Sequence, residues 1–247
     1  MPKEPLPTQD QMLGFIIRFV QQGTHDASFE VLRRYQDDFV VLFGIMQRVR
    51  RFAKAYLKLA KEGYATEARL FVRGALEHAV TAQWVFYTVG GVDRLRVSAA
   101  RDQFNLGRDT GGAQERLDEL EAAVPIGKGM PEWAAIMREM DENRFIHQTY
   151  RVMSQIVHVT HSSIVDGLDI DEHGSISVRM EPEPALEIEV LYALTACCVL
   201  VAWLFAVMSG DAQEQRRVQE RGVALHMPWR LDHHLAEERR RDAPPGL

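Results

Sequence analysis

The side chains best suited to proton-transfer chemistry lie in the segment 141–167, which has the residue pattern of a helix. At 100° per residue, one side of this helix carries imidazole, phenol and hydroxyl groups, where a solvated face normally carries long charged side chains. Groups that exchange protons near neutral pH suggest a lined cleft. The residues on this side are Asn143, His147, Tyr150, Arg151, Ser154, His158 and His161.

A second helix, expected at 66–89 with Thr66 as its N-cap, combines an apolar surface with unusual charges. Arg73 and Glu77 are four residues apart and can pair along the helix, and His78 follows directly. Because buried charge is costly, this pair needs further partners or an opening to solvent. If the two helices pack together, their polar groups converge.

Converging groups of these types would support acid–base chemistry. A histidine can act as general base or acid, an arginine can hold a phosphate or carboxylate with two hydrogen bonds, and a glutamate can orient either. The alternative is a hydrogen-bonded network that only fixes the packing of the helices. The expected catalytic set is Arg73, Glu77, His78, Tyr150, Arg151, Ser154 and His158.

Two short segments in these helices match the Arg-x4–6-His motif, and they resemble HEPN-superfamily helical proteins. One is Arg73-Gly-Ala-Leu-Glu-His78 and the other runs from Arg151 to His158. A spacing of seven puts Arg151 and His158 on one face, whereas Arg73 and His78 lie about 140° apart. In both matches the residue after the arginine departs from the polar residue usual in that superfamily.

The chain also resembles a family of uncharacterised bacterial helical proteins that carry an Arg-x3-Glu helix and a Tyr-x3-Ser-x3-His helix. The matching residues here are Arg73 and Glu77, then Tyr150, Ser154 and His158. The HEPN resemblance implies metal-independent RNA cleavage by a homodimer in a toxin or phage-defence setting. In that chemistry histidine activates the ribose 2′-hydroxyl or protonates the leaving oxygen, and arginine stabilises the charge of the phosphorane.

A basic stripe on the preceding helix is a candidate anion-binding surface on a chain of net charge -6. The competing interpretation is an ordinary solvated face. If the stripe lies on the side of the histidine cleft, RNA is favoured; if it faces away, a non-catalytic module that binds a small ligand or a partner protein is favoured. The stripe consists of Arg51, Lys54, Lys58 and Lys61.

Other chemistries have weaker support. His158 and His161, three residues apart, could contribute to a metal site, but one such pair is weak evidence, and no cofactor is expected. Ser154 lacks the glycine-rich turn of a nucleophilic serine. Adjacent Cys197 and Cys198 point in different directions on a helix, so we expect reduced thiols of a cytoplasmic protein.

The expected fold class is all-α, a single helical bundle of 247 residues with 46% hydrophobic residues. A flexible leader at 1–8, a bundle domain at 9–235 and a polar, disordered tail at 236–247 are predicted. Alternating apolar residues around a turn predict a small β-hairpin near 168–180. The uncharged run 191–208 is long enough to cross a membrane, but its composition favours a buried central helix. The other helices are expected at 9–22, 28–62, 92–108, 112–124 and from 132 onwards.

Overall fold

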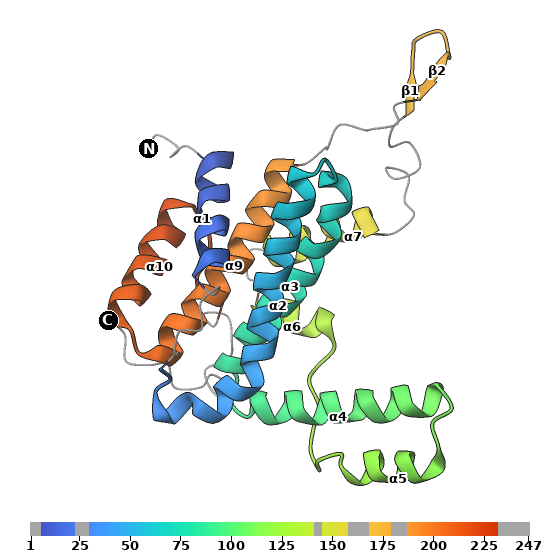
Figure 1. Ribbon diagram of the computed structural model, residues 1–247, viewed down its shortest axis with the longest axis vertical. Coiled ribbons are helices and arrows are strands. Elements are labelled where there is room, and N and C mark those ends of the chain that lie inside the picture. Colours follow the sequence, from blue (N-terminus) through green and yellow to red (C-terminus); the bar gives the residue numbers. More distant parts are fainter. Residues whose placement is uncertain (1–5, 23–29, 141–144, 158–167, 179–186, 232–247) are drawn as a thin grey trace.

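The computed structural model describes residues 6–22, 30–140, 145–157, 168–178 and 187–231, and it confirms an all-α bundle (Figure 1). Two long helices, α3 and α9, are largely buried, and the shorter helices pack around them. The elements are α1 (Gln9–Gln21), a 3-10 turn (Arg33–Tyr35), α2 (Gln36–Lys61), α3 (Ala65–Tyr87), α4 (Gly91–Asp109), α5 (Gln114–Ala122), α6 (Trp133–Met140), α7 (Phe145–Val157), β1 (Leu168–Ile170), β2 (Ile176–Val178), α9 (Glu187–Ser209) and α10 (Ala212–Ala224).

Helix α9 is the apolar centre of the bundle. Figure 1 shows it between α1 and α10 on one side and α2 and α3 on the other, and it contacts all four. By length and composition the segment Ile188–Ser209 could cross a membrane, with a mean hydropathy of 2.5, but 83% of its apolar window is buried inside the bundle. A helix that is apolar all round gains stability by packing on every side. The predicted buried central helix is confirmed.

Helix ends follow the local backbone chemistry, and two predicted ends were wrong. Helix α1 begins with a capping box in which Thr8 and Gln11 each bond the other's backbone N–H. The helix expected at 28–62 begins only at Gln36, because residues 30–32 are not helical and a 3-10 turn precedes it. Thr66 is not an N-cap: α3 already begins at Ala65, and the cap position is Tyr64, with no side-chain cap bond.

Two hairpins lie outside the central packing. Helices α4 and α5 run back along each other and extend away from the bundle in Figure 1, and α5 has no buried residue. Strands β1 and β2 pair antiparallel with Leu168 opposite Val178, which confirms the predicted hairpin. The predicted leader at 1–8 lies partly outside the described residues, and the tail at 236–247 lies wholly outside them.

Candidate functional site

The guanidinium of Arg73 joins α3 to α7. Its Nε donates to Oε1 of Glu77 at 3.3 Å, which confirms the expected pair along the helix. Its Nη2 donates to the phenol oxygen of Tyr150 at 2.9 Å, and its Cζ lies 5.1 Å from the centroid of that ring. A charged donor with two acceptors in a largely buried position forms a strong contact. The two helices expected to meet therefore do so, with Arg73 at their contact.

Helix α7 lies at the bundle edge, so its polar side is divided between the interior and solvent. Ile146 and Met153 are buried and anchor the helix. Tyr150 is half-buried, whereas Arg151 is exposed, although both belong to the predicted catalytic set. Arg151 therefore lies outside the contact with α3. His158 and His161, which carried the Arg151 motif and the metal hypothesis, lie outside the described residues.

Ser154 is half-buried on α7, one helical turn after Tyr150. Its Oγ is buried and has no hydrogen-bond partner among the described residues. Ser154 also does not line the open cavity that lies beside the contact between Arg73 and Tyr150. Its predicted place facing Arg73 and Glu77 is therefore not supported by a direct contact.

The His78 ring is held by its own helix and by α2. Its Nδ1 lies 2.7 Å from the carbonyl oxygen of Gly74, and the ring of Phe52 stands edge-on to it at 5.4 Å. A carbonyl only accepts, so Nδ1 carries the proton in this bond, and Nε2 of the neutral ring is left as an acceptor. A Cβ on Gly74 would come within 3.0 Å of Phe52. The absence of a polar side chain after Arg73 therefore follows from the close packing of α2 on α3.

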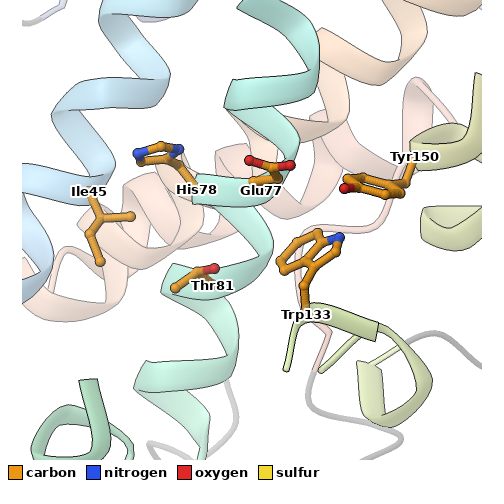
Figure 2. Close-up of a pocket in the computed structure, with 6 residues that line it drawn as sticks. All are labelled: Ile45, Glu77, His78, Thr81, Trp133 and Tyr150. Atoms are coloured by element: carbon orange, nitrogen blue, oxygen red, sulfur yellow. The ribbon is translucent and has the colours of Figure 1, made fainter. Parts of the chain in front are cut away.

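An open cavity of about 410 Å³ lies beside this contact. Figure 2 shows side chains from α3 in its middle, one residue of α2 on one side, and two aromatic rings from α6 and α7 on the other. The two rings pack together with centroids 5.7 Å apart. The volume falls within the range of roughly 300–1,000 Å³ typical of small-molecule sites. The lining residues are Ile45, Glu77, His78, Thr81, Trp133 and Tyr150.

Three of these lining residues were not expected from the sequence. Thr81 lies four residues after Glu77, so the spacing of α3 could have indicated it. Trp133 and Ile45 come from α6 and α2, and their patterns carry no sign of a cavity. Conversely, the predicted Arg73 borders the cavity without lining it, because its guanidinium is bound to Glu77 and Tyr150.

The predicted basic stripe does not reach the cavity. Its four residues, Arg51, Lys54, Lys58 and Lys61, are exposed on α2. They lie about 120–180° around the helix from Ile45, which lines the cavity, as a helix turns by about 100° per residue. By the criterion set out from the sequence, this arrangement favours ligand or partner binding over RNA.

Metal ligands and cysteine thiols are the other side chains that could support chemistry. No group of three His, Cys, Asp or Glu side chains suited to a metal occurs among the described residues, while His158 and His161 fall outside them. Burial raises the pKa of both the Cys197 and Cys198 thiols well above its usual range, so these thiols stay protonated and unreactive.

Comparisons of the chain with protein-family models, with curated proteins and with solved structures found no match.

Proposed function

We propose that the chain is a helical module that binds a small, flat organic ligand in the cavity between α2, α3, α6 and α7. The observation that carries this proposal is the lining itself. Trp133 and Tyr150 provide an aromatic wall, Ile45 an apolar one, and Glu77 and His78 polar atoms that fix orientation (Figure 2). An apolar pocket with a few convergent polar groups is the usual form of a small-molecule site.

The charges around the cavity support an organic ligand over a phosphate. The carboxylate of Glu77 lines the space and repels an anion, whereas Arg73, which would attract one, is bonded to Glu77 and Tyr150 beside it. The basic stripe that would track a nucleic-acid backbone faces the other side of α2. The cavity therefore offers little electrostatic attraction to a phosphate backbone.

A thermal-shift screen tests this proposal. The purified protein is mixed in turn with nucleosides, aromatic amino acids and polyamines. A ligand at ten times its Kd raises the Tm by about 3–6 °C, because it binds only the folded state. The variant Thr81→Phe fills the cavity and should abolish the shift, whereas Thr66→Phe, on the same helix but outside the cavity, should keep it. No shift with any probe would contradict the proposal.

A second candidate is a HEPN-like, metal-independent endoribonuclease acting as a cytoplasmic homodimer. It is favoured by two features: Arg73 bonds Tyr150 across the two motif-bearing helices, and the bond from His78 Nδ1 to Gly74 leaves Nε2 as a potential base. Total RNA incubated with the protein and EDTA would then be cleaved by the wild type, and far less by Arg73→Ala and His158→Ala. Intact RNA in every sample, at concentrations that support dimers, would rule this candidate out.

A further inference from the structure

The polar lining of the cavity combines acceptors on Glu77 and His78 with a donor on Tyr150, whose phenol oxygen accepts from Arg73 and whose O–H can donate. Glu77 contributes carboxylate oxygens, and the bond to Arg73 that orients it uses Oε1. His78 uses Nδ1 as a donor to Gly74, so its Nε2 is left to accept. The hydroxyl of Thr81 can donate or accept. The side of the cavity formed by Glu77 and His78 therefore fits a ligand edge that carries several N–H donors.

The charge balance favours a neutral donor over a cation. Arg73 and Glu77 already form an ion pair at 3.3 Å, so a bound cation would add an uncompensated charge beside the guanidinium. The rest of the lining is Ile45, Trp133 and Tyr150, which offers apolar and aromatic surface (Figure 2). Aromatic side chains bind flat rings by stacking at little conformational cost.

We infer that the cavity binds a guanine base, with Glu77 reading its edge. Guanine carries N1–H and the exocyclic N2–H₂ side by side, and these parallel donors match the two oxygens of a carboxylate as an arginine fork does. Adenine, cytosine and uracil each place an acceptor next to their donor, and a carboxylate repels that acceptor. The inference rests on the proposed ligand-binding function and names its ligand class.

Guanine can reach the cavity as a free nucleoside or nucleotide, or as an unpaired residue of RNA. Both sources present the same base edge, so the recognition chemistry is shared. The volume of about 410 Å³ accommodates a nucleoside. A strand that delivered its base here would place its phosphates outside the cavity, away from the carboxylate of Glu77.

Isothermal titration calorimetry of the full chain tests the inference, with guanosine, adenosine, cytidine and agmatine as probes. We expect guanosine to bind at least about tenfold more tightly than each of the others, the discrimination of a good two-bond base contact. Glu77→Gln replaces one acceptor by a donor and should remove most of this preference. Glu67→Gln, the same change at an exposed position of the same helix, should leave it intact.

Circular dichroism and the Tm establish that both variants fold, and Thr81→Phe provides a second variant that blocks the cavity without touching the ion pair. Equal affinity for guanosine and adenosine, or tighter binding of agmatine, would overturn the inference. If other probes shift the Tm but guanosine does not bind, the inference fails and the ligand-binding function stands. If no probe binds, both fail.

The source of the base is read from two further titrations, with GMP and with a five-nucleotide single strand holding one central guanosine among uridines. Binding of the strand at least about tenfold more tightly than GMP supports the inference with RNA as the source. Tighter binding of GMP supports it with a free nucleotide. A strand with adenosine at the centre should bind more weakly than the guanosine strand, and equal affinity would again overturn the recognition.

Discussion

Helices α3 and α9 lie side by side at the centre of the bundle, yet they differ in what they bury. Along α9 the described interior positions are apolar apart from Thr195, whose hydroxyl bonds the carbonyl of Leu191 on its own helix at 2.7 Å. Helix α3 carries charged and amide side chains on its packed surface, including Arg69 and Gln83. A polar group in a core costs stability unless it is bonded. Helix α9 therefore contributes mainly apolar packing, whereas α3 also carries buried polar side chains that need hydrogen-bond partners.

Two polar side chains of α3 bond the helices α6 and α7. Arg73 bonds Tyr150 of α7, and the indole Nε1 of Trp84 donates to Glu139 of α6 at 2.9 Å. On this face α3 also lines the cavity through Glu77. Where α3 packs against α9, Gln83 instead bonds the carbonyl of Leu200. Helix α3 thus makes polar contacts on both packed sides, and the side toward α6 and α7 is the one that also lines the cavity.

The largest expected effect comes from breaking the packing of α9. Leu204 is fully buried, so Leu204→Ala should lower the free energy of unfolding by about 2–5 kcal/mol through lost burial and a residual cavity. Urea denaturation measures this change. Val223→Ala, at a position of α10 that is 57% exposed, is the control and should change stability by less than about 0.5 kcal/mol. A small effect at Leu204 would contradict a close-packed central helix.

Raising the pH should also lower the free energy of unfolding, because α9 buries two neutral thiols. Burial raises the pKa of Cys197 and Cys198 above the ordinary value of 9.0, so above that pH the unfolded chain loses thiol protons that the folded chain keeps. The stability from the neutral thiols is full below pH 9 and falls above it, by about 1.4 kcal/mol per pH unit for each thiol.

Unfolding free energies between pH 8 and pH 10 measure this slope. The double variant Cys197→Ala/Cys198→Ala lacks both thiols and should show a shallower fall, which separates them from other groups that titrate in this range. Equal slopes for the two proteins would contradict buried, protonated thiols. A thiol reagent at pH 8 should label the wild type only after denaturation.

Removing the hydrogen bond between α3 and α7 should lower the free energy of unfolding by less than breaking the packing of α9. Tyr150→Phe deletes the oxygen that accepts from Arg73 and should cost about 1 kcal/mol, since Arg73 is partly exposed and water can replace the bond. Chemical denaturation measures it, with Tyr64→Phe at an exposed site as control. A double-mutant cycle with Arg73→Gln should give a coupling of at least about 0.5 kcal/mol. Additive effects would show that the bond contributes nothing.

The smallest effect is expected at Ser154. Its buried Oγ has no partner among the described residues, so Ser154→Ala should leave stability unchanged or raise it by up to about 1 kcal/mol. Thr195→Val removes a bonded buried hydroxyl of α9 and is the matched contrast. A loss above about 1 kcal/mol at Ser154 would reveal a polar partner and strengthen its predicted place in the site.

Much of the candidate site was predictable because helical spacing is local. Arg73 and Glu77 pair as their four-residue separation requires, and an apolar helix with charges on one face had to place those charges at an opening or beside partners. The start of α2 was missed because Leu32 takes an extended backbone, a choice that the residue pattern of 28–35 does not reveal. The catalytic role of the predicted set remains a prediction.

By itself, the sequence determined the all-α class, the burial of α9, the small hairpin and which residues share a face of α3, because each follows from periodicity and composition over neighbouring residues. Only the tertiary structure decided that Tyr150 meets Arg73, that Ile45 and Trp133 complete a cavity, and that the basic stripe turns away from it. These outcomes depend on how helices distant in sequence rotate and pack against one another, and that is set by the fit of whole surfaces rather than by local spacing.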